Sequence, residues 1–152
     1  MRDKRFVAKH RGGSLGAEKH VLLLRWACAC ARHVLGPRRP IDERLASALA
    51  TARAWETGRA GVGEARQAAL RALAAAREAV VPASIAAARC VAHAVAAAHM
   101  ADHALDAADY ALKAVRAAGR SVEKEKAWQE KQLPEAIKKL VRAARSKRPP
   151  LR

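Results

Sequence analysis

Apolar residues recur at helical spacing along most of the chain, and no stretch of useful length alternates apolar and polar residues as a strand does. This pattern predicts helices at about 17–35, 41–57, 61–80, 121–132 and 135–145. Gly36 and Gly58 stand where the first two of these patterns end, and glycine accepts the backbone conformations with which helices commonly stop. Ser121 is the predicted N-cap of the segment that follows it.

The segment 83–118 contains neither Gly nor Pro and is long enough for a single helix of about 54 Å. Its apolar stripe argues against one straight helix. The stripe around Val91 and Val95 is rotated by about a third of a turn from the stripe around Leu105. We therefore expect a kink or a break near 99–102.

The predicted fold is all-α: a single compact, bundle-like domain of six or seven Ala-rich helices. It spans 1–152, with a basic flexible arm at about 1–15, extended or frayed, and a basic tail at about 146–152. Ala favours helices but buries little surface, so the few large apolar residues must supply most of the hydrophobic stabilisation. We expect Trp26, Trp55 and Trp128 to be largely buried for this reason.

Positive charge is concentrated at the two ends of the chain, whose formal net charge is +16. Residues 1–39 hold ten Lys or Arg against two acidic residues, a net of +8. Residues 136–152 hold seven Lys or Arg and no acidic residue, a net of +7. The middle of the chain is close to neutral.

Two interpretations fit these basic ends. They can neutralise phosphates and bind RNA or DNA without sequence preference, or they can be solvated and keep the protein in solution. Neither a nucleic-acid-binding motif nor a set of stacking aromatic residues accompanies them. The residues that would contact nucleic acid are Arg2, Lys4, Arg5, Lys9, Arg11, Lys138, Lys139, Arg142, Arg145, Lys147 and Arg148.

Little in the sequence points to an enzyme. Asn is absent, Thr occurs only twice, and pockets that orient small substrates usually need several neutral polar side chains. Neither a Gly-x-Ser-x-Gly turn nor a phosphate-binding Gly loop is present. Cys28, Cys30 and Cys90 form no Cys-x-x-Cys pair, so we interpret them as small buried apolar residues. We expect no catalytic residues and no cofactor.

One group of residues could carry chemistry. His99 and His103 are four residues apart and Asp106 continues the same helical face, a spacing at which two imidazoles and a carboxylate can hold zinc or iron. The alternatives are a structural polar cluster or a partner-binding role. The residues of the structural cluster would be His93, His99, Asp102 and His103.

The start of the chain has basic residues without the apolar core of a secretory signal. No apolar run approaches the roughly 18 residues that a membrane span requires. We therefore expect a cytoplasmic protein without a membrane partner.

Four segments, taken in order, resemble a known family. Residues 25–35, RWACACARHVL, resemble the Trp-Ala-x-x-Cys-Ala-x-x-Val-Leu opening of the proposed immunity proteins found in bacterial polymorphic toxin loci. Residues 92–104 resemble that family's His-Ala-x-x-x-x-His-x-x-x-His stretch. The remaining similar segments are 110–114 and 125–129 with Leu133-Pro134.

The resemblance covers about 20–141 and implies an all-helical protein that neutralises a cognate toxin by binding it. It supplies no catalytic residue to carry over. A protein that blocks the phosphate-binding cleft of a nuclease is usually acidic, so the basic ends argue against a basic nuclease as the toxin. The alternative function is that of a small accessory protein that binds nucleic acid through its terminal arms.

Overall fold

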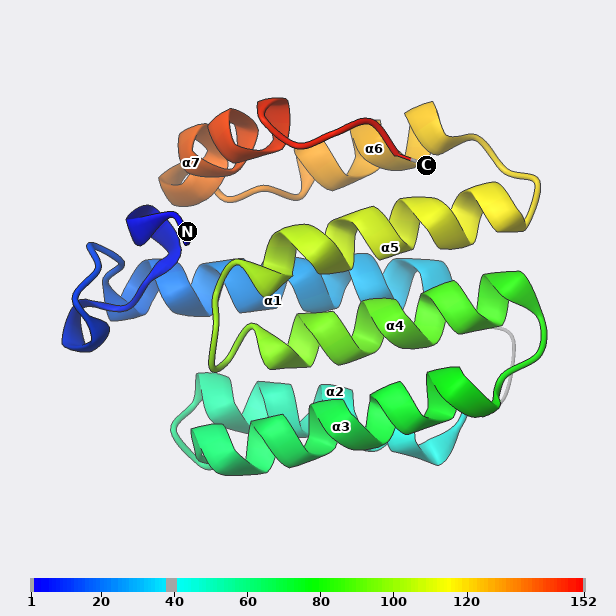
Figure 1. The fold of residues 1–152 in the computed structure, drawn as a ribbon, viewed down its shortest axis with the longest axis horizontal. Coiled ribbons are helices and arrows are strands. Elements are labelled where there is room, and N and C mark those ends of the chain that lie inside the picture. Colours follow the sequence, from blue (N-terminus) through cyan, green and yellow to red (C-terminus); the bar gives the residue numbers. More distant parts are fainter. Residues whose placement is uncertain (1, 38–40, 152) are drawn as a thin grey trace.

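The computed structural model describes residues 2–37 and 41–151 (Figure 1). Its α-helices are α1 (Ala17–Leu35), α2 (Glu43–Glu56), α3 (Val62–Glu78), α4 (Pro82–Ala96), α5 (His103–Ala117), α6 (Val122–Lys131) and α7 (Glu135–Ser146). Two short 3-10 turns, η1 (Lys4–Phe6) and η2 (Lys9–Arg11), precede them. The described residues contain no β-strand, and the predicted all-α fold is confirmed.

The helices lie side by side in a bundle. In Figure 1, α2 and α3 form one edge, α6 and α7 form the opposite edge, and α1, α4 and α5 lie between them. Helix α4 packs against α3 and α5 and also contacts α1 and α2. This position explains why Cys90, Val91, Ala94 and Val95 of α4 are fully buried.

Alanine allows α4 and α5 to approach each other closely. Ala94 on α4 and Ala104, Ala108 and Ala111 on α5 have no exposed surface. Because the alanine side chain is a single carbon, the backbones of α4 and α5 lie close together. Polar side chains near the ends of the two helices can therefore contact each other. The site described below depends on this proximity.

The chain reverses direction between α4 and α5, as the rotated apolar stripe predicts. Residues 97–102 form turns rather than continuing the helix, and α5 returns antiparallel to α4 (Figure 1). The predicted break near 99–102 is confirmed.

Helix ends follow the predicted stop and start signals. Gly36 follows α1 with a φ of 69°, which L side chains rarely adopt. The hydroxyl of Ser121 accepts a hydrogen bond from the backbone N–H of Lys124 at 3.2 Å, and so caps α6.

Residues 2–15 do not form the predicted extended or frayed arm. They fold into the turns η1 and η2, and Phe6 and Leu15 are each only 3% exposed. The backbone N–H of Leu15 donates to the carbonyl of Val7 at 3.0 Å, which closes the segment on itself. Two apolar anchors in a basic segment are the physical reason that the prediction of an extended arm is wrong. Met1 and Arg152, the outermost residues of the predicted arm and tail, lie outside the described residues.

The three tryptophans are not equally buried. Trp26 is 2% exposed, as predicted. Trp55 and Trp128 are partly buried and pack against the core, so they are less deeply buried than Trp26. Helices α2 and α6 lie at the outside of the bundle, where one side of a large ring stays accessible.

Among the described helices, none is both long and apolar enough to cross a membrane.

Candidate functional site

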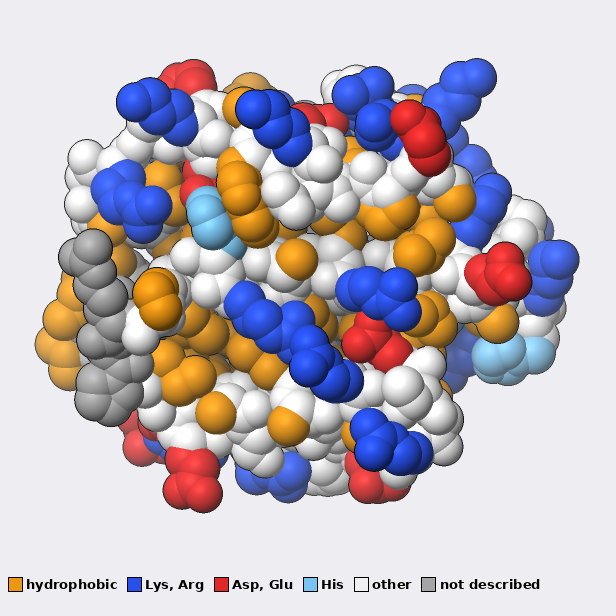
Figure 2. Space-filling view, turned by 180° about the vertical axis from the view of Figure 1, so that it is seen from behind, with side chains coloured by type: hydrophobic (Ala, Val, Ile, Leu, Met, Phe, Trp, Pro, Cys, Tyr) orange, Lys and Arg blue, Asp and Glu red, His pale blue; other side chains and the backbone are white. Residues whose placement is uncertain are grey.

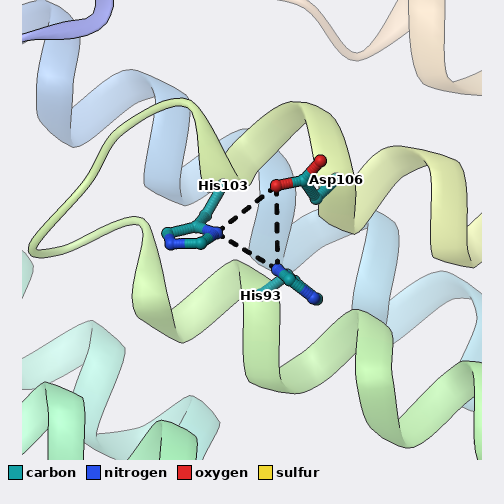
Figure 3. Close-up of side chains that lie close together, drawn as sticks. All are labelled: His93, His103 and Asp106. Carbon is teal, nitrogen blue, oxygen red and sulfur yellow. Dashed lines mark hydrogen bonds and ion pairs between the residues drawn. The ribbon is translucent and has the colours of Figure 1, made fainter. Parts of the chain in front are cut away.

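The end of α4 and the start of α5 bring three potential ligands together (Figure 3). The Nδ1 atoms of His93 and His103 lie 3.2 Å apart. Asp106 Oδ2 lies 3.3 Å from the Nδ1 of His103 and 3.8 Å from the Nδ1 of His93. His103 and Asp106 share one face of α5 at a spacing of three residues, and His93 faces them from α4. We call these three residues the His-Asp cluster.

The C-terminal residues hold the carboxylate of this cluster in place. Arg148, just after α7, donates one hydrogen bond to Asp106 Oδ1 at 2.6 Å and another to Asp109 Oδ2 at 2.9 Å. Burial by itself raises the pKa of Asp106. The hydrogen bonds from His103 and Arg148 together outweigh burial, so the pKa lies below its ordinary value. Asp106 is therefore ionised at neutral pH.

The imidazole of His93 is fixed by an aromatic neighbour. Its ring stacks on that of Tyr110, one turn further along α5, with centroids 5.0 Å apart. Burial is the main cause that lowers the pKa of His93, and the charge of Asp106 offsets this only in part. The ring is therefore neutral at pH 7, with a nitrogen lone pair on one of its two nitrogens.

The structure corrects the set of ligands expected from spacing. His99 lies in the turn between α4 and α5, not in a helix with His103, so the spacing of four residues does not align the two imidazoles. The ring centroids of His99 and His103 lie 5.4 Å apart. His99 Nδ1 is buried and has no hydrogen-bond partner among the described residues. Burial, followed by the charge of His103, lowers the pKa of His99 to about 4. His93 takes the place that the sequence pattern assigned to His99.

Asp102, another residue of the predicted polar cluster, faces the N-terminal segment. Its Oδ2 pairs with the guanidinium of Arg2, while its Oδ1 is buried without a partner. Arg11 donates to Met100 Sδ at 3.1 Å in the same turn. The predicted structural cluster is thus divided in two: His93 and His103 face Asp106, whereas Asp102 belongs to the contact with the N-terminal segment.

A shallow depression of about 240 Å³ lies beside the histidines. Leu70 and Leu73 of α3 form part of its wall, and Leu70 is 58% exposed. The polar side chains that line it are Arg66, His93, His99 and His103. An apolar surface with imidazoles at one side can accept an apolar or weakly polar group of a partner.

A second polar network lies between α1, α5, α6 and α7, and sequence reasoning did not identify it. The side chain of Gln129 is fully buried, donates to the carbonyl of Ala108 at 3.0 Å and accepts from Arg145 at 2.7 Å. The indole N–H of Trp26 donates to the backbone carbonyl of Gln129 at 2.9 Å. This network fastens the α6–α7 edge to the bundle. The Trp-Gln pair within 125–129 was the available signal.

Trp128 lies against a partly buried hydrogen bond between His33 and Glu125 on the same edge. His33 of α1 donates from Nδ1 to the buried carboxylate of Glu125 at 2.7 Å. The ring of Trp128 stacks on His33 with centroids 3.6 Å apart and an interplanar angle of 5°. The ring of Trp128 is partly buried and packs against the core.

The cysteines offer no nucleophile. Cys28, Cys30 and Cys90 are all buried, as predicted, and none forms a disulfide. Burial raises the pKa of Cys28 to about 12 and also raises the pKa of Cys30 and Cys90 well above that of an ordinary thiol. A thiol with such a pKa is not ionised at neutral pH and is poorly reactive.

Internal ion pairs occupy most of the arginines that were expected to contact nucleic acid. Six of the eleven predicted contacts have a carboxylate partner within 4 Å: Arg2, Arg5, Lys138, Arg142, Arg145 and Arg148. Arg11 instead bonds to the turn before α5. Lys4, Lys9, Lys139 and Lys147 remain exposed. The basic ends therefore serve in part to hold the N-terminal segment and the tail on α5, and binding of nucleic acid through them remains a prediction.

Comparison with known proteins gives one match. The model of a protein family described as "Imm-5 like putative immunity protein" matches residues 13–136. None of the curated proteins and none of the solved structures matches the chain. The matched residues run from just before α1 to the first turn of α7, and they include the whole His-Asp cluster and Gln129.

Proposed function

Because this chain belongs to the family of Imm-5 like putative immunity proteins, as its sequence motifs indicated, we propose that it binds a protein toxin and neutralises it without catalysing a reaction. The family match over most of the chain is the observation that carries this proposal. The matched residues form α1 to α6 and the start of α7, so they make up almost all of the described bundle.

The chemistry of the described residues supports binding rather than catalysis. The three thiols are buried and un-ionised at neutral pH. Nine of the fourteen carboxylates are held in ion pairs with Lys or Arg. A protein that works by contact needs instead a stable surface of defined charge and shape.

The α6–α7 edge is the surface that we assign to the toxin. Residues 122–148 hold nine Lys or Arg against four Glu, a net of +5. Figure 2 shows Lys and Arg side chains gathered along this edge, at the top of the view. Lys139, Arg142 and Lys147 are exposed, and the partly buried ring of Trp128 belongs to the same edge. Aromatic and basic groups together are typical of binding hot spots.

Charge complementarity indicates which charge the contact surface of the toxin carries. A surface of net positive charge is steered towards an acidic one and repels another basic surface. The toxin's contact surface is therefore acidic. This excludes the phosphate-binding cleft of a nuclease as the contact.

Growth rescue tests the proposal. Expression of the toxin domain encoded in the same locus should arrest a bacterial host, and co-expression of this chain should restore growth. The double variant Lys139→Glu, Lys147→Glu should lose protection, because it replaces attraction by repulsion at the α6–α7 edge. Neither lysine has a carboxylate partner among the described residues, so the variant should remain folded.

The matched control is Arg71→Glu with Arg77→Glu. It makes the same change in charge on α3, at the opposite edge of the bundle, also at exposed side chains. Protection by this control and loss of protection by the α7 variant support the proposal. Failure of the unaltered chain to protect would refute the function, and equal effects of the two variants would refute the assignment of the α6–α7 edge.

A further inference from the structure

The His-Asp cluster has the donor set and the spacing of a metal site. We propose that His93 Nδ1, His103 Nδ1 and Asp106 Oδ2 bind one divalent transition metal ion, with zinc as the ion that fits best. This proposal does not rest on the assignment of the toxin surface, although Arg148 at the end of the α6–α7 edge contacts Asp106. Imidazole nitrogen together with carboxylate oxygen is a ligand combination that zinc accepts in proteins.

The distances between the ligand atoms agree with a tetrahedral ion. Zinc binds His nitrogen at about 2.0–2.1 Å and carboxylate oxygen at about 2.0–2.2 Å, which places neighbouring ligands about 3.4 Å apart. The three separations in the cluster are 3.2, 3.3 and 3.8 Å. As Figure 3 shows, the three atoms face one another around a common centre. Three protein ligands leave the fourth position for water or for a group of a partner.

Hydrogen bonding alone leaves this arrangement incompletely satisfied. A neutral imidazole carries one N–H, and an ionised carboxylate only accepts. If both Nδ1 atoms carried hydrogen, the two N–H groups would meet at 3.2 Å. If only His103 Nδ1 carried hydrogen, this N–H could donate a well-aligned hydrogen bond to His93 or to Asp106, but not to both. A cation at the centre interacts favourably with all three atoms at once.

The surroundings hold the ligands in the orientation that a metal requires. Arg148 engages Asp106 Oδ1, which leaves Oδ2 to face the imidazoles, and Tyr110 stacks on the ring of His93. Hydrogen bonds to a ligating carboxylate are a regular feature of protein metal sites. The charge of Arg148 is offset by Asp109, to which it also bonds, so the guanidinium does not exclude a nearby cation.

Direct measurement of zinc binding tests the site. Untagged, chelator-treated protein is titrated with Zn²⁺ by calorimetry, and its Co²⁺ complex is examined by visible absorption. The unaltered chain should bind one ion, and the Co²⁺ spectrum should show four-coordinate ligand-field bands without a thiolate charge-transfer band. His93→Gln, His103→Gln and Asp106→Asn should each weaken Zn²⁺ binding at least ~10-fold, because loss of a ligand costs no less than loss of a group that positions one.

His99→Gln is the matched control. His99 lies beside His103 but outside the three-atom centre, so this variant should keep the affinity of the unaltered chain. Circular dichroism of the metal-free proteins checks that each variant is folded, and a zinc-dependent rise in Tm for the unaltered chain and His99→Gln alone gives a second readout. No binding by the unaltered chain, a thiolate band with Co²⁺, or loss of binding in His99→Gln with retention in His93→Gln would overturn the proposal.

Discussion

Gln129 has no exposed surface, yet both polar atoms of its side chain have partners on different helices. Its amide donates to α5 and accepts from Arg145 on α7, while its backbone carbonyl accepts from Trp26 on α1. Most buried polar groups in proteins have at least one hydrogen-bond partner, and both polar atoms of the Gln129 side chain meet this requirement. The residue therefore sets how α6 and α7 sit on the bundle, and with them the surface assigned to the toxin.

Replacing Gln129 by Ala should lower the free energy of unfolding by about 2–4 kcal/mol. The change removes the hydrogen bond from Gln129 to the Ala108 carbonyl and the one from Arg145 to Gln129, while Arg145 keeps its contact with Glu130. A neutral hydrogen bond contributes about 0.5–1.5 kcal/mol and one from a charged group about 1.5–3 kcal/mol. Urea unfolding measures the effect. Gln132→Ala, at an exposed position three residues on, should change the free energy by no more than about 0.5 kcal/mol. Equal effects at the two positions would show that the network does not hold the edge.

At the residue scale, spacing in the sequence identified two of the three side chains that the structure brings together, His103 and Asp106, and one that lies outside the cluster, His99. His103 and Asp106 lie on one helix, so their relation could be predicted from helical geometry. His93 could not be assigned to them, because its contact with His103 depends on how tightly α4 and α5 pack and on where the turn at 97–102 ends. Gln129 was missed for a similar reason, since its partners come from three other helices.

Most of the helices were predictable because their signals are local. Apolar periodicity, the Gly stops and the Ser121 cap act within one or two turns of the chain, and helix boundaries followed them closely. The segment before α1 was not predictable in the same way. Phe6 and Leu15 are single apolar residues in a basic, Gly-containing stretch, and only the fold provides the surface that buries them.

Gly13 provides a test of this N-terminal segment. A Cβ at Gly13 would lie 2.0 Å from the carbonyl oxygen of Val7, so Gly13→Ala must push the backbone at residue 13 away from the backbone at Val7. The variant should release residues 2–11 from the bundle, so that the backbone at the exposed residues Lys4, Arg5 and Lys9 can unfold into the trypsin active site and be cleaved faster. The rate of cleavage at these residues, measured by mass spectrometry, reports the release.

Gly16→Ala is the control, because a Cβ there meets no atom within 4 Å and its backbone is extended. It should leave the cleavage rate of the unaltered chain unchanged. Rapid cleavage of the unaltered chain at the same residues would contradict the packed N-terminal segment described here.

At the scale of the whole molecule, the net charge of +16 is used in two ways. Part of the positive charge forms ion pairs within the molecule. Arg2 and Arg148 bind carboxylates of the α4–α5 region and hold the two terminal segments against it. Another part is exposed: the lysines of 122–148 that lack a carboxylate partner among the described residues, such as Lys139 and Lys147, give the α6–α7 edge its positive surface. Total charge is readable from the sequence, but this division is not, because it depends on which carboxylates the fold brings near each end.

The central claim is that the molecule acts by occupying its toxin and not by turning over a substrate. Titration of toxin activity with increasing amounts of this chain tests it most directly. An inhibitor that binds one to one removes activity in proportion to its amount, so inhibition should be complete near one equivalent and should be reversed when the complex is dissociated and the toxin refolded. Complete and lasting loss of toxin activity at far less than one equivalent would show a catalytic action and contradict the account.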